Sequence, residues 1–251
     1  MSADSDARTD EPLPVAGRRW IASRPLLALA PVLLVLGAAA MLIDEPLGRW
    51  CLADECPGFF RDLFELVEVF GHGLGVVLIV LVVHQLDPPR RWALPRVLAC
   101  SLGAGLAVDV VKLLVARARP HHFDFEGGIW ASFGGWLPFL SAGSAGQSFP
   151  SAHTATAVGL AAALAWLYPQ GRRVFVVLAV LVACQRVEGG AHFPSDVLCG
   201  AAVGCLVAAA CLEFGRLPGR FDRLERRLGR PSPPAALGPP DGQQQAGSLT
   251  A

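Results

Sequence analysis

The sequence predicts an all-α membrane protein, with six transmembrane helices in a bundle, a helical or irregular outward loop and both termini in the cytoplasm. Of its 251 residues, 53% are hydrophobic and only 17% are charged, a composition typical of integral membrane proteins and not of soluble enzymes. Six apolar stretches alternate with polar connections, and most approach the ~20 residues needed to cross a bilayer. Lys and Arg residues fall mainly in alternate connections, which is the pattern that sets membrane topology.

The expected spans are, in chain order, Pro25 to Ile43, Leu66 to Leu86, Pro95 to Val115, Ala152 to Tyr168, Val174 to Cys184 and Pro194 to Phe214. Basic residues precede the first stretch as they do in a signal sequence, but its length and its place in the series favour an uncleaved span. The fifth stretch is short, and at ~1.5 Å per residue it covers little more than half of a ~30 Å core. We therefore expect Arg186, just beyond it, to lie below the outer surface and to face a protein interior or a wet cavity.

The charge distribution divides the chain into three parts. Residues 1–24 are expected to be a disordered cytoplasmic segment, residues 25–215 a transmembrane domain, and residues 216–251 a basic interfacial segment with a disordered tail. In a bacterial-type cell this predicts a multi-pass protein of the inner membrane. The turn that carries His192 should then face the periplasm or exterior.

The first outward connection, Asp44 to Glu65, is acidic and contains a run with helical spacing. The apolar residues of that run are Phe59, Leu63, Leu66 and Phe70, which predicts a surface helix leading into the second span. Cys51 and Cys56 lie in the same connection, where an oxidising compartment would permit a disulfide. His72, between two glycines, is interpreted as a helix-packing or interface residue, and the alternative is that it lines the site.

The stretch from Gln185 to Asp196 is a Gly-rich turn between two apolar segments. Arg186 can hold a phosphate through a planar, charge-assisted fork. His192 can act as a nucleophile or general acid, and a hydrogen bond from one ring nitrogen to the Asp196 carboxylate would fix its tautomer. Pro194 suits the first position of the next helix. The simpler alternative is a polar turn with a satisfied histidine.

A second group of charges closes the third span. Lys112 and Arg119 are seven residues apart, so a continuous helix would place them on one face, with ~10.5 Å of rise between them, where both can reach one anion. Asp109 could orient or neutralise Lys112. The alternatives are a snorkelling Lys112 and interfacial anchors at Arg117 and Arg119.

Ser151 and His153 open the fourth span. A serine at a helix start caps free amides, and those amides together with the positive end of the helix form an anion site. His153, in the first turn, could give a proton to a leaving oxygen.

Together these groups resemble the type 2 phosphatidic acid phosphatase family of membrane lipid phosphatases, within the haloperoxidase-related superfamily. The residues that carry the resemblance are Lys112, Arg119, Pro120, Pro150, Ser151, His153, Arg186, His192 and Asp196. Order, spacing and outward placement all agree, over roughly residues 66 to 214. Two positions depart from the family pattern, since Ala152 stands where glycine is usual and Gln185 where serine is usual.

The resemblance implies a metal-independent, cofactor-free hydrolase of phosphoric esters or diphosphates on membrane lipids. His192 would form a phosphohistidine, oriented by Asp196, while His153 protonates the leaving group. The residues implied to hold the phosphate oxygens are Lys112, Arg119, Ser151, Ala152 and Arg186. Isoprenyl diphosphate, phosphatidic acid, phosphatidylglycerol phosphate and lipid A phosphate all fit, and the sequence does not choose among them.

The long loop from His121 to Gln147 has the composition of a mobile interfacial cover. Within it His122, Asp124 and Glu126 would share one side of an extended segment, so a cation site is the alternative to a polar lid. Our expectation is that no metal binds. The sequence contains no internal repeat, nucleotide loop or nucleic-acid-binding pattern.

Two other functions remain open at this level. A lipid phosphotransferase could use the same residues. A small transporter could use Lys112 and Asp109 as an ion or substrate path, but it leaves the paired outward histidines unexplained.

Overall fold

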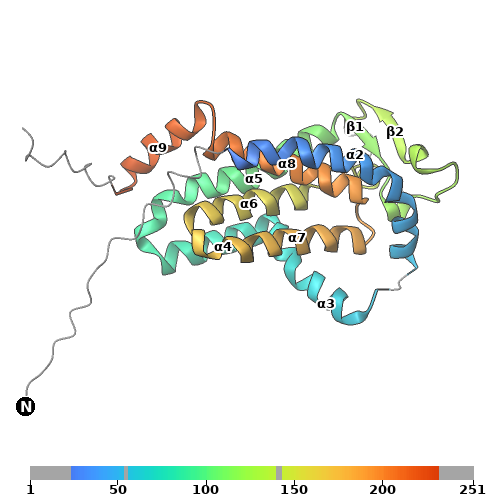
Figure 1. Cartoon of the computed structure of the whole chain (residues 1–251), viewed down its shortest axis with the longest axis horizontal. Coiled ribbons are helices and arrows are strands. Elements are labelled where there is room, and N and C mark those ends of the chain that lie inside the picture. Colours follow the sequence, from blue (N-terminus) through green and yellow to red (C-terminus); the bar gives the residue numbers. More distant parts are fainter. Residues whose placement is uncertain (1–23, 54–55, 140–142, 232–251) are drawn as a thin grey trace, which may run out of the picture.

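The computed structural model describes residues 24–53, 56–139 and 143–231. Six helices run along one direction and form a bundle (Figure 1). They are α2 (Pro25–Leu52), α4 (Gly73–Leu86), α5 (Leu94–Lys112), α6 (Ala152–Leu167), α7 (Arg172–Glu188) and α8 (Pro194–Leu212). The disorder expected for the N-terminal segment and for the end of the tail falls outside the described residues.

The shorter elements lie at the ends of the bundle. Two are helices, α3 (Gly58–Val67) and α9 (Leu217–Arg227), and five are 3-10 turns: η1 (Glu68–Gly71), η2 (Pro88–Ala93), η3 (Pro120–His122), η4 (Ile129–Ser132) and η5 (Pro169–Gly171). Two short strands, β1 (Val115–Arg117) and β2 (Phe133–Trp136), pair antiparallel. Apolar length permits three of the described helices to cross a membrane, or four if the bent α3–α4 pair is one span.

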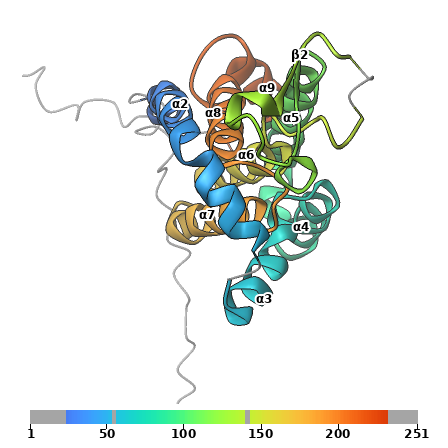
Figure 2. The same cartoon turned by 90° about the vertical axis from the view of Figure 1, so that its right-hand side faces the viewer.

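Helix α6 lies at the centre of the bundle, in contact with α5, α7 and α8 (Figure 2). It can do so because its sequence is rich in Ala and Gly, which lets neighbouring backbones approach closely. A Cβ at Gly159 would lie 2.1 Å from the Cys100 carbonyl oxygen of α5, and a Cβ at Gly204 would lie 2.7 Å from the Ala155 carbonyl oxygen. Small residues therefore fix the three helices whose ends carry the predicted site.

The second expected span is broken in two. The predicted surface helix is present as α3, but α4 begins only at Gly73, and the two axes differ by 71°. The turn η1 continues the α3 arm to Gly71, so the 71° bend falls at His72. His72 caps α4 by accepting a hydrogen bond from Leu74 N at its Nδ1 (3.2 Å). Gly71 is required there, since a Cβ would lie 2.7 Å from Val182 and 2.8 Å from the His153 carbonyl oxygen.

The third expected span ends earlier than predicted and the fifth ends later. Helix α5 stops at Lys112, and the next residues turn into β1, so the all-α expectation misses a two-stranded sheet. Helix α7 continues through Arg186 to Glu188 and ends at a glycine pair, in which Gly190 has a positive φ of 61°. The helix can continue beyond the apolar stretch because Arg186 finds hydrogen-bond partners inside the protein.

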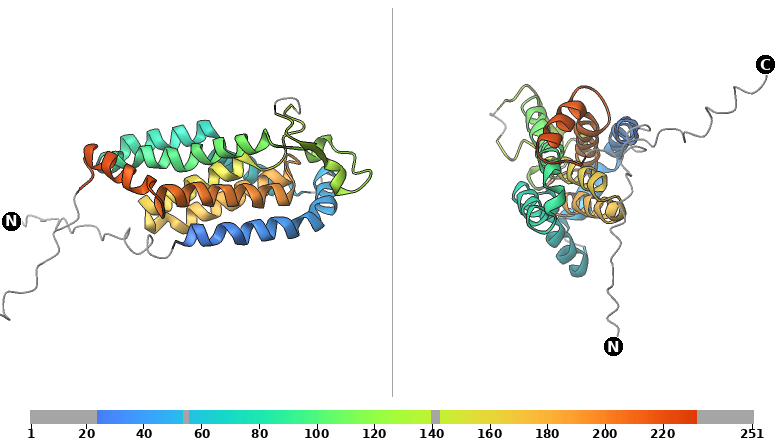
Figure 3. Two further views of the ribbon diagram at one scale, coloured as in Figure 1. Left: turned by 90° about the horizontal axis from the view of Figure 1, so that it is seen from above. Right: turned by 90° about the vertical axis from the view of Figure 1, so that its left-hand side faces the viewer.

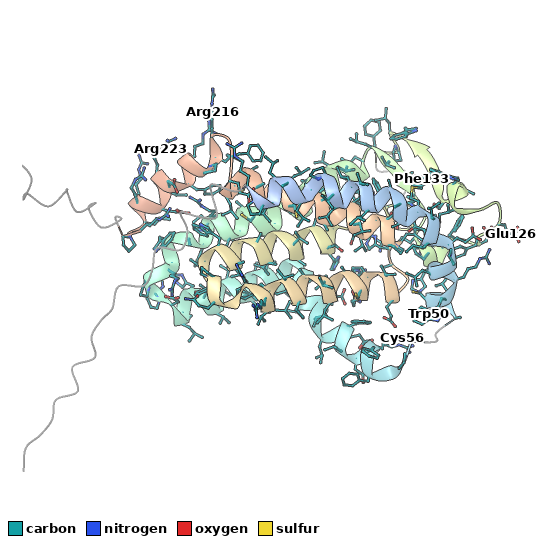
Figure 4. All side chains as sticks on the ribbon, in the orientation of Figure 1. Trp50, Cys56, Glu126, Phe133, Arg216 and Arg223 are labelled. Atoms are coloured by element: carbon teal, nitrogen blue, oxygen red, sulfur yellow. The ribbon has the colours of Figure 1, made fainter. Side chains whose placement is uncertain are left out.

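The predicted basic helix after Gly215 is confirmed as α9, at the end of the bundle where α2 begins (Figure 3). It packs against the protein through acidic residues: buried Arg96 of α5 bonds Glu225 (2.6 Å) and Asp222 (2.7 Å). Arg216 and Arg223 point away from the bundle (Figure 4). A membrane-surface role for α9 stays a prediction.

Candidate active site

Four helix ends meet at the end of the bundle that carries the sheet (Figures 1 and 3). These are the C-terminal ends of α5 and α7 and the N-terminal ends of α6 and α8. The amide of Ser151 donates to the carbonyl of Asp196 (3.0 Å), and a Cβ at Gly200 would lie 2.4 Å from the Ser151 carbonyl oxygen. The three polar groups singled out in the sequence are thereby brought together.

His192 lies between α7 and α8 and is 2% exposed. Its Nδ1 is 2.7 Å from the carbonyl oxygen of Ser148. A carbonyl only accepts, so Nδ1 carries the proton and Nε2 carries the lone pair. Burial lowers the pKa of His192 well below its usual value, and the cations Arg119, Arg186 and Lys112 lower it further. The ring is therefore a neutral imidazole with a free lone pair on Nε2.

The predicted hydrogen bond from the His192 ring to the Asp196 carboxylate is not formed, because the nearest carboxylate oxygen is 3.9 Å from Nδ1. Asp196 instead accepts from the Ser148 hydroxyl (2.6 Å) and from the Phe193 amide (2.9 Å). It therefore fixes both segments that hold the histidine, namely the one that supplies the carbonyl partner and the one that precedes α8. Its part in setting the tautomer passes through Ser148.

The fully buried guanidinium of Arg117 joins this group to α2, a contact that the sequence interpretation missed. It bonds Asp196 and Ser195 (2.7 Å) on α8 and Asp44 (2.7 Å) on α2. Asp44 also accepts from the amide (3.0 Å) and hydroxyl of Ser195. The sequence did contain a signal for this contact: Asp44 directly follows an apolar span, and a charge at that depth needs a partner.

Arg186 and His153 face one another across a carboxylate that the sequence interpretation did not consider. Glu68 of η1 places Oε1 2.7 Å from Arg186 Nη1 and 3.6 Å from His153 Nε2. Among the described residues, the buried Arg186 Nε and His153 Nε2 have no hydrogen-bond partner. Buried donors are almost always paired, so these two atoms mark a place for an oxygen-rich ligand. Gln185 is buried, and its Oε1 accepts from Arg186 (3.2 Å).

Lys112 and Arg119 do not share a helix face as predicted, because the helix ends between them. Lys112, 8% exposed, is the last residue of α5, and its Nζ lies 3.8 Å from Asp109. Arg119 follows β1, and its Nε donates to the Ser144 carbonyl (2.9 Å). Both still act electrostatically on His192. The sheet, not a continuous helix, brings the second cation to the site.

Ser151 caps α6 as predicted, accepting from the amide (3.4 Å) and hydroxyl (3.0 Å) of Thr154. Its own amide donates to the Asp196 carbonyl, so in this structure that amide is engaged by the protein; a phosphate contact from Ser151 stays a prediction. The amide of Ala152, at the first helical position, lacks an intrahelical acceptor. The Ala152 side chain packs against the cluster of Ala104, Val108 and Ala155.

In the segment suggested as a cation site, a carboxylate instead bonds the local backbone. Asp124 Oδ1 accepts from the Glu126 amide (2.9 Å). Within residues 24–53, 56–139 and 143–231, no group of three His, Cys, Asp or Glu residues is placed to hold a metal ion. Part of the loop from His121 to Gln147 is the strand β2, and its mobility stays a prediction. The disulfide that the sequence would permit between Cys51 and Cys56 is not formed, since Cys51 is a free thiol.

Comparison with known proteins gives one family. A family model described as the PAP2 superfamily matches residues 93–217. A lipid A 1-phosphatase of Rhizobium etli is 31% identical over 241 residues, which cover 85% of this chain and 99% of that protein. A decaprenylphosphoryl-5-phosphoribose phosphatase of Mycobacterium tuberculosis is 30% identical over 165 residues, covering 63% of this chain and 82% of that protein.

Two solved structures share the fold. The crystal structure of Aquifex aeolicus LpxE aligns with a TM-score of 0.51 at 18% identity, over 68% of this chain and 96% of that one. A PAP2 type phosphatidylglycerolphosphate phosphatase from Bacillus subtilis aligns with a TM-score of 0.52 at 19% identity, over 79% and 94%.

Proposed function

Because this chain belongs to the PAP2 superfamily and is a membrane lipid phosphatase, we propose that it hydrolyses a lipid phosphate or diphosphate through a phosphohistidine on His192. The observation that carries the proposal is the His192 ring, which is buried, neutral and bonded through Nδ1 to the Ser148 carbonyl. Its free Nε2 is the nucleophile that the reaction needs.

In the first step, His192 Nε2 forms a bond to phosphorus while the bond to the lipid oxygen breaks. His153 donates its proton to that oxygen, which leaves as an alcohol or, from a diphosphate, as a phosphate. Arg186 and Lys112 hold the equatorial oxygens with Arg119, and the Ala152 amide adds a donor at the start of α6. In this role Arg186 uses its unpaired Nε.

In the second step, water attacks phosphorus and gives a proton to His153, and the bond from phosphorus to Nε2 breaks. Free phosphate leaves and both histidines return to their starting states. Asp196 and Ser195 take no part in bond making. Asp196 keeps the Ser148 carbonyl in place, and that carbonyl stabilises the positive charge that the phosphorylated ring carries.

For the membrane arrangement we propose six spans, α2, α3–α4, α5, α6, α7 and α8, within a domain of residues 25–215. Residues 1–24 and 216–251 then lie on the cytoplasmic side, and the site faces the periplasm or exterior of an inner membrane. Support comes from the positions of α2 and α9. Helix α2 begins at the end of the bundle that carries α9, opposite the sheet and the site (Figure 3). The arginine-rich connections belong to that end.

The experiment is phosphate release by the detergent-purified protein with a chelator present. Lipid A 1-phosphate is the first substrate to test, because a near-full-length relative carries it in its name. Undecaprenyl diphosphate and phosphatidic acid are the comparisons. We expect release to be abolished by His192→Ala and kept by His84→Ala, which removes an exposed histidine of α4.

Labelled phosphate trapped on the protein should resist alkali and be lost in acid, as expected of a phosphohistidine. Release that persists in His192→Ala would refute the mechanism. Transfer of the label to an added lipid in place of water would make the protein a phosphotransferase.

A further inference from the structure

We propose that Glu68 is a positioning residue of the active site, in which its carboxylate orients Arg186 and provides the counter-charge for His153 when that ring is protonated. The inference rests on the proposed function, since it assigns His153 as the proton donor. Glu68 lies outside the segment matched by the family model, which begins at residue 93. No motif in the sequence pointed to it.

The geometry around Glu68 is specific. A single oxygen, Oε1, lies 2.7 Å from Arg186 Nη1 and 3.6 Å from His153 Nε2. The bond to Arg186 uses Nη1, so Nε of the same guanidinium, buried and unpaired in the described part of the chain, stays available for a phosphate oxygen. Glu68 can therefore hold Arg186 without competing for the atom that binds substrate.

Glu68 is also held in place by the fold. It begins η1, the turn that continues the α3 arm to Gly71, just before the chain bends by 71° into α4. This turn packs against α6 and α7, so closely that a Cβ at Gly71 would meet both Val182 and the His153 carbonyl. The break in the second span thus places a carboxylate beside the first turn of α6.

The charge balance gives this carboxylate a task. Besides Glu68, the titratable and charged groups that act on His153 are all basic and come from α4, α5, α7 and the segment after β1: His72, Lys112, Arg186 and Arg119. Each of them disfavours protonation of the His153 ring. Protonated His153 therefore needs a nearby anion to keep its proton until the leaving oxygen takes it, and Glu68 is the carboxylate within reach.

Glu68→Gln and Glu68→Ala separate the two parts of the role. Glutamine keeps an oxygen that can accept from Arg186 but carries no charge, so we expect KM within about twofold of wild type and kcat lower by about tenfold near neutral pH. The alkaline limb of the kcat profile should move about one pH unit lower, because the protonated ring loses its anion. Alanine should in addition raise KM, because Arg186 loses its partner.

Glu65→Gln is the matched control, since Glu65 is exposed on α3 one turn away. A Glu68→Gln profile that superimposes on wild type would overturn the proposal. So would a gain in kcat/KM with tighter inhibition by vanadate, which would show that the carboxylate only competes with phosphate. A wild type that releases no phosphate, or an active His192→Ala, would instead refute the proposed function.

Discussion

Removing the Arg117 guanidinium tests whether the buried network holds together the helix ends that carry the candidate site. Arg117, Asp44 and Asp196 all have side chains that are 0% exposed, and the arginine pairs with both carboxylates. Arg117→Met keeps similar bulk and leaves two buried carboxylates without their cation. Breaking one buried pair by removing a partner costs about 3–5 kcal/mol, so we expect at least that loss.

The matched control is Arg49→Met on α2. Arg49 pairs with Glu45 at 3.0 Å, but its side chain is 54% exposed, and a surface pair is worth about 0–1 kcal/mol. The same chemical change should thus cost several times more at Arg117. At about 2–4 °C per kcal/mol for a chain of this size, we expect Tm to fall by roughly 6–20 °C for Arg117→Met and by a few degrees for Arg49→Met.

The assay is thermal unfolding in one detergent, with the folded fraction followed by size-exclusion fluorescence. In the Arg117→Met background, a second substitution, Asp44→Asn, should add little further loss of stability. The Asp44 carboxylate has already lost its partner there. Equal and small losses for Arg117→Met and Arg49→Met would refute the reasoning, since they would mean that the network contributes no more than a surface pair.

Two further predictions concern His192 and the η1 turn. Because its pKa is lowered in the folded protein, His192 stays neutral below pH 6.5 while the unfolded chain takes up a proton. Stability should therefore fall as pH falls through that value. Between pH 7.5 and 5.5, the free energy of unfolding of wild type should drop by about 1 kcal/mol more than that of His192→Gln. Equal drops in denaturant titrations would contradict this. Gly71→Ala should lower both Tm and kcat. Gly73→Ala should change neither, because its Cβ would meet only Leu102 at 3.8 Å. Similar values for the two variants would show that η1 can shift without cost.

Much of the site was readable from the sequence because its parts are local patterns. Arg186, His192 and Asp196 lie within one turn region, and Ser151 with His153 forms a helix start, so short-range spacing alone indicated their chemistry. Apolar length alone located the helices, because the bilayer sets how many residues a span needs. The family followed from the same residues, and the matching family model together with a relative 31% identical to this chain confirms it.

What only the tertiary structure decided are the contacts between segments far apart in the chain. Asp44 and Arg117 are separated by 73 residues, and Glu68 and Arg186 by 118, so no local period links them. The third span also ends where local propensity did not require it, at Lys112, because pairing of β1 with β2 satisfies the backbone beyond that point. The hydrogen bond that His192 Nδ1 donates to the Ser148 carbonyl also joins residues far apart in the chain. A backbone oxygen leaves no trace in residue identity, so sequence can name the residues that react but not the neighbours that hold them.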